Sequence, residues 1–502
     1  MESKAIKKLV ILGGGTAGWM AAALMIRMLG KVVDITLVES DQIGTVGVGE
    51  ATIPPILTFN QALGLDEKEF LRETKGSIKL GIQFENWSKE GESYMHAFGS
   101  IGKDFPLCDF HNFWIRYREQ GGTDSYWDYS LNYQAAVQNK FAQLGKIPNT
   151  NLPGITYAYH FDAGLYAKFL RRQAEGRGVK RVEGKVTNVQ KCAETGFVEQ
   201  LALENGQVVD GDLFVDCSGF VGLLIDKAVG SEYESWKQWL PCDRAIALPS
   251  GSPEYIPPFT RSVAHGAGWQ WQIPLQHRTG NGLVYSSSHW SDEQARSVLF
   301  DNLPGEPLAE PRVIPFRTGH RREQWCKNVV SLGLASGFLE PLESTSIHLV
   351  QSAATRLIKC FPHRGIRKED VSEFNRQSRV EMERIRDFII LHYKANQRRD
   401  TDFWRHCEDM AIPDSLHEKM ELFRATGKVF RDYDDLFTEI AWYQVMIGQG
   451  LVPEDHHIIA DGLNDGQLND LMQSLKTLVQ GTVKQLPRHE EFLSAMLRKK
   501  SK

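Results

Sequence analysis

Several features that would place a chain in a specialised class are missing from these 502 residues. The seven cysteines are scattered and never in C-x-x-C spacing, which argues against a disulfide framework and a zinc ribbon, so we expect no metal site. Basic residues are not in excess, because Lys and Arg total 58 against 63 Asp and Glu. A formal net charge of −5 argues against nucleic acid or an anionic membrane as a partner.

Long uninterrupted apolar runs are lacking as well. The uncharged stretch from Leu9 to Ile26 follows three lysines, as a secretory signal would, but four glycines interrupt it and a strand-like segment comes soon after. What is present, with 42% hydrophobic and 24% charged residues, is ordinary globular composition. We therefore expect a folded, cytoplasmic protein that does not enter a membrane.

The first forty residues have the pattern of a strand–helix–strand unit. The apolar run Lys8–Leu12 predicts a strand, Trp19–Leu29 a helix and Val32–Glu39 a second strand. Two later segments, Asp212–Gly219 and Asn328–Gly337, have the same form of an apolar run that ends in small residues. We interpret them as further strands of one sheet.

The pattern of apolar and polar residues along the chain changes near residue 370. Amphipathic patterns typical of helices follow at 371–395, 416–431, 433–447 and 465–480. The sequence therefore predicts an α/β core built from discontinuous segments within residues 1–370 and a mainly helical region over 371–502.

A glycine-rich turn between the first strand and helix carries the clearest motif. Gly13, Gly15 and Gly18 satisfy G-x-G-x-x-G, with Thr16 and Ala17 between them, and Glu39 ends the next strand 21 residues after Gly18. In such a unit the helix N-terminus binds a pyrophosphate and the acid binds a ribose. The alternative is a turn that only lets helix pack on strand, with Glu39 solvated. The motif predicts a dinucleotide site without separating NAD from FAD.

Four further blocks resemble the flavin-dependent halogenases of the tryptophan and indole type. They are Gly47–Pro54, Lys75–Trp87, the segment Gly268-Trp-Gln-Trp-Gln-Ile-Pro274, and Glu340–Ile347. The third block matches the W-x-W-x-I-P motif of that family. In the family, this motif is thought to keep the organic substrate away from the flavin. If it is a strand, Trp269 and Trp271 face the same side and form one wall. A tryptophan pair that merely packs a strand core is the alternative.

The resemblance implies a fold and an activity. The fold is an α/β FAD-binding core of the flavin monooxygenase type, with a helical C-terminal region that covers the substrate. The activity uses reduced FAD, O2 and chloride or bromide to make hypohalous acid, which halogenates an indole-type aromatic molecule. No second nicotinamide fingerprint is visible, so a separate NAD(P)H-dependent flavin reductase is the implied partner.

Two residues match the catalytic pair of the family. Lys79 corresponds to its lysine, which orients the electrophilic halogen toward an aromatic carbon, and Glu343 corresponds to its glutamate, which polarises hypohalous acid and accepts the ring proton. Without the resemblance, Lys79 would be interpreted as a surface lysine and Glu343 as an acid at the start of a helix.

The residues after Glu343 match the halide-binding segment of the family. Thr345 and Ser346 precede a helical pattern over Ile347–Lys359, whose N-terminus can bind an anion, although the family usually has glycine in place of Ser346. A simple helix cap is the alternative interpretation. The remaining flavin contacts that the resemblance implies are Ala51, Val186, Leu334 and Ile347.

The substrate chamber is matched only in part. His96 and Phe98 resemble residues that line it, beside the wall of Trp269 and Trp271. Tryptophan halogenases hold the amino acid through a Tyr-Tyr pair and a downstream Glu, but the segment Ala441–Gly450 has neither. The expected substrate is therefore an indole or a larger indolic or phenolic molecule. An aromatic hydroxylase on the same fold and a non-catalytic flavoprotein are the competing hypotheses.

Overall fold

The computed structural model describes residues 5–44 and 49–498, which divide into two compact units. Unit 1 comprises residues 1–76, 161–243 and 315–383, and unit 2 comprises 77–160, 244–314 and 384–502. Each unit is thus assembled from three separate segments. Within the described part of the chain, no helix has the length and apolar character needed to cross a membrane.

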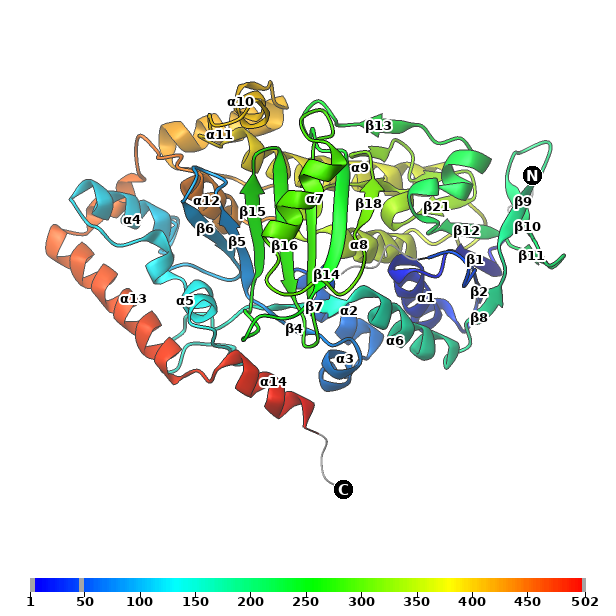
Figure 1. Cartoon of the computed structure of the whole chain (residues 1–502), viewed down its shortest axis with the longest axis horizontal. Coiled ribbons are helices and arrows are strands. Elements are labelled where there is room, and N and C mark those ends of the chain that lie inside the picture. Colours follow the sequence, from blue (N-terminus) through cyan, green and yellow to red (C-terminus); the bar gives the residue numbers. More distant parts are fainter. Residues whose placement is uncertain (1–4, 45–48, 499–502) are drawn as a thin grey trace. The chain divides into compact units, whose positions relative to one another are not determined.

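Unit 1 is built on a six-stranded sheet in the order β20-β21-β12-β1-β2-β8 (Figure 1). The strands are parallel except β20, and Lys8 pairs with Asp34 while Leu9 pairs with Leu213. The elements of unit 1 are β1 (Lys8–Leu12), α1 (Thr16–Leu29), β2 (Asp34–Glu39), β3 (Gly49–Ala51), α2 (Pro55–Leu63), α3 (Glu67–Glu73), α6 (Ala163–Glu175), β8 (Lys180–Glu183), β9 (Val186–Lys191), β10 (Val198–Leu203), β11 (Val208–Asp210), β12 (Leu213–Asp216), η2 (Gly219–Val221), the π-helical turn η3 (Leu223–Ala228), β13 (Tyr233–Ser235), β19 (Gly319–Arg321), β20 (Trp325–Cys326), β21 (Val329–Ser331), η4 (Gly333–Ala335), β22 (Gly337–Phe338), η5 (Pro341–Glu343) and α8 (Ser346–Lys359).

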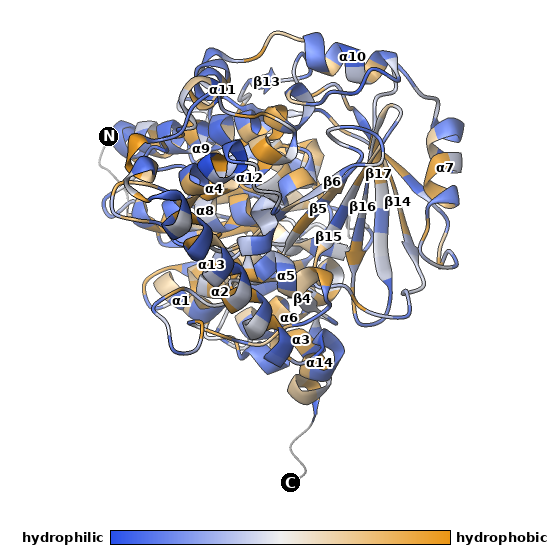
Figure 2. Ribbon diagram, turned by 90° about the vertical axis from the view of Figure 1, so that its left-hand side faces the viewer, coloured by the Kyte–Doolittle hydropathy of each residue, from blue (hydrophilic) through white to orange (hydrophobic). Residues whose placement is uncertain are grey.

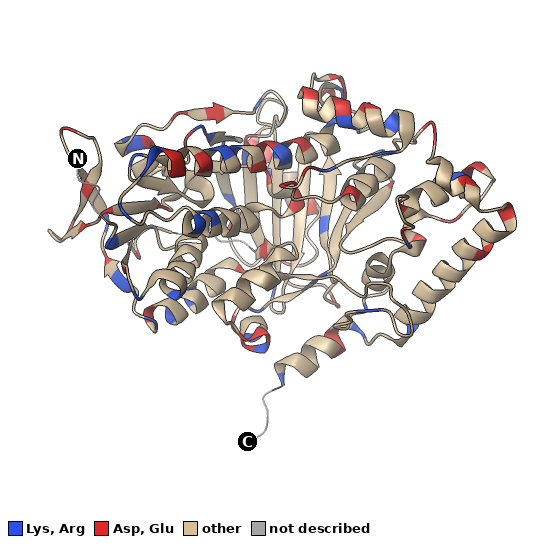
Figure 3. Ribbon diagram, turned by 180° about the vertical axis from the view of Figure 1, so that it is seen from behind, with Lys and Arg blue, Asp and Glu red and all other residues tan. Residues whose placement is uncertain are grey.

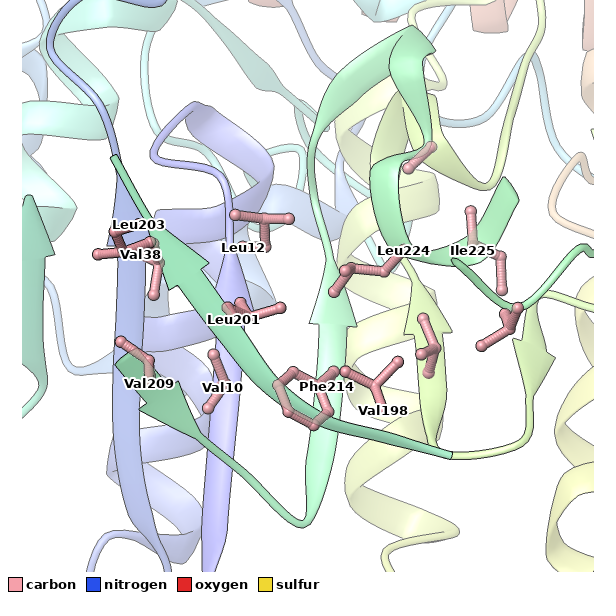
Figure 4. Close-up of a cluster of buried hydrophobic side chains, with 13 residues drawn as sticks. Val10, Leu12, Val38, Val198, Leu201, Leu203, Val209, Phe214, Leu224 and Ile225 are labelled. Carbon is pink, nitrogen blue, oxygen red and sulfur yellow. The ribbon is translucent and has the colours of Figure 1, made fainter. Parts of the chain in front are cut away.

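A small antiparallel sheet, β11-β10-β9, packs across the parallel sheet of unit 1. Leu201 and Val198 of β10 point toward Val10 and Phe214 on the strands beneath (Figure 4), and all four side chains are buried. Burial of about 25 cal/mol per Å² of apolar surface makes such a layer the main source of stability. The packing fixes the strands whose carboxyl ends carry the glycine turn.

Unit 2 contains a seven-stranded sheet in the order β18-β14-β17-β16-β15-β5-β6. Its strands pair antiparallel from β14 to β15, β15 runs parallel to β5, and β5 is antiparallel to β6. The elements of unit 2 are β4 (Ser77–Lys79), β5 (Gly81–Glu85), β6 (Ser93–Ala97), α4 (Phe110–Glu119), η1 (Tyr126–Tyr129), α5 (Leu131–Val137), β14 (Arg244–Ser250), β15 (Thr260–His265), β16 (Gly268–Pro274), β17 (Thr279–Tyr285), α7 (Asp292–Asp301), α10 (Asp402–Asp409), α11 (Asp414–Thr426), α12 (Glu439–Gly448), η6 (Ile458–Gly462), α13 (Asp465–Gln485) and α14 (His489–Leu497). Three elements contain a boundary between the units: β7 (Ala158–Asp162), β18 (Arg312–Pro315) and α9 (Lys368–Lys394).

The two faces of this larger sheet are covered differently. Helix α7 packs Ala295 and Leu299 against Leu283 on one face, and Figure 2 shows α12 on the other side of the strands. Helix α12 also protects the edge strand β6, because the Gln444 side chain accepts from the Ala97 N–H at 2.9 Å and donates to its carbonyl at 3.0 Å. In both units Lys and Arg are interspersed with Asp and Glu (Figure 3).

The elements agree closely with the patterns in the sequence, and the differences have local causes. Strand β1 and helix α1 lie where expected, as do the later strands β12 and β21, which join the same sheet. The expected helix over 433–447 begins only at Glu439, because Asp432 and Asp435 close a turn just before it, with the Asp432 N–H donating to the Asp435 carboxylate at 3.0 Å.

Candidate active site

The glycine turn of unit 1 has the geometry of a phosphate-binding loop. Gly13 has φ +113°, and a Cβ there would lie 2.3 Å from the Cys217 carbonyl oxygen. A Cβ at Gly18 would lie 1.8 Å from the Gly13 carbonyl oxygen. Gly15 is the N-cap of α1 and supplies no side-chain cap to the first-turn N–H groups. The turn therefore places backbone donors and a helix dipole where an anion can approach.

Glu39 lies directly beside this turn. Its Oε2 occupies the space that a side chain at position 14 would need, at 1.3 Å from an ideal Cβ. Its Oε1 accepts a hydrogen bond from Arg181 Nε at 2.5 Å, a partner that the sequence did not indicate. The carboxylate is thus fixed at the end of β2 rather than solvated. These features fit a dinucleotide, with Gly13, Gly15 and Gly18 as the pyrophosphate cradle and Glu39 beside it.

One other segment expected to bind flavin, at Leu334, lies beside the first turn of α1. Gly333, which follows β21 and precedes Leu334, would place a Cβ 2.9 Å from Ala17 on α1 and 3.5 Å from Val350 on α8. The turn η4 therefore lies between the first turn of α1 and helix α8. The remaining expected contacts are distributed over unit 1, with Thr16 donating to the Ala163 carbonyl, Ala51 on β3, Val186 at the start of β9 and Ile347 in the first turn of α8.

Glu343 and Thr345 lie in the approach to helix α8. Glu343 ends the 3-10 turn η5 and is 1% exposed, and the following residue, Ser344, has φ +59°. Thr345 is the N-cap of α8 and is fully buried, yet its hydroxyl makes no cap bond. Among the residues that the structure describes, that hydroxyl oxygen has no hydrogen-bond partner. A buried hydroxyl without a partner costs about 1–3 kcal/mol, so this helix terminus resembles a binding site rather than a cap.

Lys79 lies at the end of β4 in unit 2 and is fully buried, which excludes the surface-lysine alternative. Its Nζ lies 5.4 Å from the centroid of the Phe98 ring. Lysine is almost never fully buried without a specific reason. Lys79 belongs to unit 2 and Glu343 to unit 1.

The segment Gly268–Pro274 forms strand β16, as predicted, and its two tryptophans are adjacent. The ring centroids of Trp269 and Trp271 are 6.1 Å apart. Space for the second ring comes from Gly282 on the neighbouring strand, where a Cβ would lie 2.0 Å from the Trp271 ring. Both side chains are at least nine-tenths buried, so the pair also packs the sheet.

A continuous series of aromatic rings connects this pair with Lys79. Consecutive centroids are 5.6 to 6.5 Å apart along the whole series. In order from the strand, the rings after Trp271 and Trp269 are those of Trp87, His392, Phe388, His96 and Phe98. Phe388 and His392, which the sequence analysis did not single out, come from the C-terminal part of α9. The expected chamber residues His96 and Phe98 are thereby brought next to Lys79.

Two side chains in and just before helix α12 extend the series of aromatic rings. Phe437, just before the helix, stacks on Phe388 with a centroid distance of 3.8 Å, and Trp442 contacts Phe388 edge-on at 4.8 Å. The indole nitrogen of Trp442 is buried and has no hydrogen-bond partner in the described part of the chain. Tyr443 donates to the Asp109 carboxylate at 2.9 Å and is therefore already engaged. The pair at 442–443 thus differs in chemistry from two tyrosines that hold an amino acid.

Beneath Lys79 lies a group of buried polar residues that the sequence did not reveal. Ser77 contacts the Pro274 carbonyl oxygen and His160, and His160 contacts Thr260. Burial, together with the charge of Lys79, holds the pKa of His160 well below its usual value. A lone histidine in an apolar strand is more often a packing residue, so only the fold brings this group to light. Among residues 5–44 and 49–498, no cluster of His, Cys, Asp or Glu is arranged to hold a metal ion.

Comparison with known proteins gives one consistent result. The sequence model of the tryptophan halogenase family matches residues 8–465. The tryptophan 7-halogenase of Lentzea aerocolonigenes is 35% identical over 483 residues, which cover 89% of this chain and 90% of that protein. Flavin-dependent halogenases from Xanthomonas campestris and Brevundimonas sp. BAL3 superpose with TM-scores of 0.95 and 0.94, at 48% and 44% identity, and in each case 98% of this chain and 99% of the other are covered.

Proposed function

The chain belongs to the tryptophan halogenase family, and from that premise we propose that it uses reduced FAD, O2 and chloride or bromide to make hypohalous acid and halogenate an indole-type substrate. The observation that carries the proposal is Lys79, a fully buried cation at the end of a series of aromatic rings that begins at the W-x-W-x-I-P strand. An aromatic hydroxylase has no use for such a buried cation.

The residues that would hold FAD are those of the glycine turn, Glu39 and the segment at Leu334, with further contacts from Ala51, Val186 and Ile347. Reduced FAD bound there would supply two of the four electrons that O2 accepts, and the halide ion would supply the other two as it becomes hypohalous acid. The chain contributes the anion cradle of α1 and a carboxylate fixed by Arg181. Its flavin arrives already reduced, so a separate NAD(P)H-dependent flavin reductase is the proposed partner.

The halide would bind at the start of α8. The Thr345 hydroxyl is buried without a partner, and the N–H groups of the first turn carry the positive end of the helix dipole. A halide accepts hydrogen bonds from both kinds of donor. Ser346 lies at the first helical position, where its side chain would border the same ion.

Lys79 and Glu343 divide the transfer of the halogen between them. The Lys79 ammonium donates to hypohalous acid, or carries the halogen as a haloamine, and orients the electrophile toward a ring carbon. The Glu343 carboxylate polarises the same oxidant and accepts the proton that leaves the substituted ring. Both side chains are nearly or fully buried, and in such surroundings oriented charges act more strongly than in water.

The substrate is an indole or a larger indolic molecule rather than free tryptophan. A group of mutually contacting aromatic side chains begins at Phe98, whose ring lies 5.4 Å from Lys79 Nζ, and continues through His96, Phe388, Phe437 and Trp442. The Trp442 N–H is an unused donor that suits an acceptor atom on the substrate, whereas the Tyr443 hydroxyl is already bonded to Asp109. The pair supplies no carboxylate to bind an amino acid's ammonium group.

Product analysis tests the proposal directly. Purified protein is incubated with FAD, a flavin reductase, NADH and indole, with chloride, bromide or neither, and the products are identified by mass spectrometry. We expect a brominated indole with the bromine isotope doublet, and its loss in Lys79→Ala with FAD binding retained. An oxygenated product that is indifferent to halide would establish the hydroxylase instead. FAD binding without trapping of hypohalous acid by monochlorodimedone would establish a non-catalytic flavoprotein.

A further inference from the structure

Strand β4 holds Lys79 by an unusually small number of backbone pairs. The strand has three residues, and Ser77, Ile78 and Lys79 pair with His160, Tyr159 and Ala158 of β7. Ser77 and Lys79 are two residues apart and share one side of the strand. A contact that fixes Ser77 therefore also fixes the direction in which Lys79 leaves the strand.

The hydrogen bonds at Ser77 run in a direction that the chemistry determines. The Pro274 carbonyl oxygen can only accept, so the Ser77 hydroxyl donates to it at 2.6 Å. The Ser77 oxygen is then the acceptor for His160 Nδ1–H at 3.1 Å. A neutral imidazole with a proton on Nδ1 has a lone pair on Nε2, which accepts from the Thr260 hydroxyl at 2.9 Å. The relay therefore runs from Thr260 through His160 and Ser77 to Pro274.

A second histidine fixes the middle of the strand. The Ile78 N–H donates to His489 Nε2 at 3.2 Å, so the proton of this ring is on Nδ1 and donates to the Ile256 carbonyl at 2.8 Å. Burial lowers the pKa of His489 to about 4. The charged groups that act on these two rings are Lys79 on His160 and Glu490 on His489, and His489 in turn acts on His160.

We infer that Thr260, His160 and Ser77 form a directional hydrogen-bond relay that fixes Lys79 relative to the end of the W-x-W-x-I-P strand, and that they are positioning residues for halogen transfer. The inference rests on the proposed function. The side chains of Ser77 and His160 are fully buried and Thr260 is 5% exposed, so the relay is shielded from bulk water. None of the three contacts an oxidant or a substrate, and each acts through Lys79.

The relay explains what a missing hydroxyl at residue 260 would do. Without that donor, the Nε2 lone pair of His160 is buried without a partner, which costs free energy. The ring is then no longer held on the side of residue 260, so the bond from its Nδ1–H to Ser77 and the bond from Ser77 to the Pro274 carbonyl both weaken. Lys79 would no longer be held in the geometry that transfers the halogen, and misplacement by about 1 Å can cost on the order of a hundredfold in rate.

A matched pair of variants at residue 260 tests the relay. Thr260→Val keeps the branched shape without the hydroxyl, and Thr260→Ser keeps the hydroxyl. Three quantities are measured for each: trapping of hypohalous acid by monochlorodimedone without indole, formation of halogenated indole, and the protonated nitrogen of His160 from imidazole ¹⁵N shifts in histidine-labelled protein. Thermal unfolding reports the folded fraction.

We expect wild type to carry its His160 proton on Nδ1 at pH 7. In Thr260→Val we expect a changed ¹⁵N shift of His160 Nε2, because its lone pair no longer accepts a hydrogen bond. We also expect unchanged trapping of hypohalous acid and about a ten- to hundredfold loss of halogenated indole, with the shift and the product both restored in Thr260→Ser. Three results would overturn the relay. The first is a His160 proton on Nε2 in wild type, and the second is halogenation by Thr260→Val at the wild-type rate. The third is a loss of both activities in Thr260→Val in proportion to its unfolded fraction. Wild type that makes neither hypohalous acid nor halogenated indole refutes the proposed function instead, while the ¹⁵N result still decides the relay.

Discussion

The two units carry their expected functional groups by different means. Unit 1 uses backbone: a glycine turn, the first turns of α1 and α8, and a hydroxyl at a helix terminus. Unit 2 uses side chains from distant segments, with Lys79, the aromatic rings of two strands, two helices and the loops beside them, and a buried histidine relay. Backbone N–H groups can bind the anions that take part in every catalytic cycle, the pyrophosphate of the cofactor and the halide. Side chains are better able to bind an organic substrate, whose structure varies. Changes in the glycine turn and the helix termini of unit 1 should therefore affect oxidant formation, and changes in unit 2 only the use of the oxidant.

The largest effect should follow from filling the glycine turn. In Gly13→Ala the new Cβ would lie 2.3 Å from a backbone oxygen at an unfavourable φ of +113°, so we expect loss of FAD binding, of hypohalous acid and of product together, with at least about 3 kcal/mol of lost stability. Flavin fluorescence titration and thermal unfolding measure this. Gly178→Ala is the control, because its φ is +110° but nothing lies within 4 Å of its Cβ. Equal effects of the two variants would show that strain, and not the cradle, is responsible.

As the pH falls, unit 2 should lose stability before unit 1 does. Burial lowers the pKa of His111 and His489 in unit 2 to about 4, so the unfolded chain binds protons that the folded chain excludes as the pH falls from about 6.5 to 4. Each contributes about 3 kcal/mol of acid destabilisation. In unit 1, burial raises the pKa of Glu381, but the hydrogen bonds and charges of His348 and Arg356 outweigh the effect of burial and hold that pKa at about 2. The stability that ionised Glu381 contributes is therefore lost only as the pH falls from about 4.5 to 2.

Hydrogen exchange at pH 7 and pH 5, corrected for intrinsic rates, checks this difference. We expect amides of unit 2 to lose protection at pH 5 before those of unit 1, and His489→Gln to reduce the pH dependence. Equal loss of protection in both units would contradict the assignment of the acid-sensitive groups to unit 2.

The contrast between the units also shows what a sequence can reveal. The glycine turn, Glu39 and the strand of the two tryptophans were predictable, since each depends on residues close in sequence. Arg181, Phe388 and His160 were not, because their partners lie 142, 292 and 83 residues away, at Glu39, His96 and Ser77. A histidine between tyrosine and phenylalanine in a strand has the pattern of a core residue until β4 and β15 are brought beside it. The helix expected from 433 failed for a local reason, the turn made by Asp432 and Asp435.

A smaller effect should come from the helix terminus of unit 1. Thr345→Val removes a buried hydroxyl without a partner, so we expect equal or slightly higher thermal stability in the absence of halide. The same change removes a donor to the anion and should raise the KM for bromide about tenfold, at about 1.4 kcal/mol, while Thr345→Ser should stay close to wild type. The KM is measured by monochlorodimedone trapping, which does not depend on unit 2. A lowered stability with an unchanged KM would mean that the hydroxyl has a structural partner instead.

The smallest effect should come from a substitution of Trp442, which is proposed to donate a hydrogen bond to a substituent of the substrate. Trp442→Phe keeps the edge contact with Phe388 and removes only the unused N–H. A neutral hydrogen bond contributes about 1 kcal/mol, so the KM for an indole bearing a carbonyl or amide should rise about fivefold while that for plain indole stays constant. Trapping of hypohalous acid should not change, because oxidant formation belongs to unit 1. If both indoles lose affinity equally, the ring of Trp442 and not its N–H recognises the substrate, and unit 2 selects its substrate by shape alone.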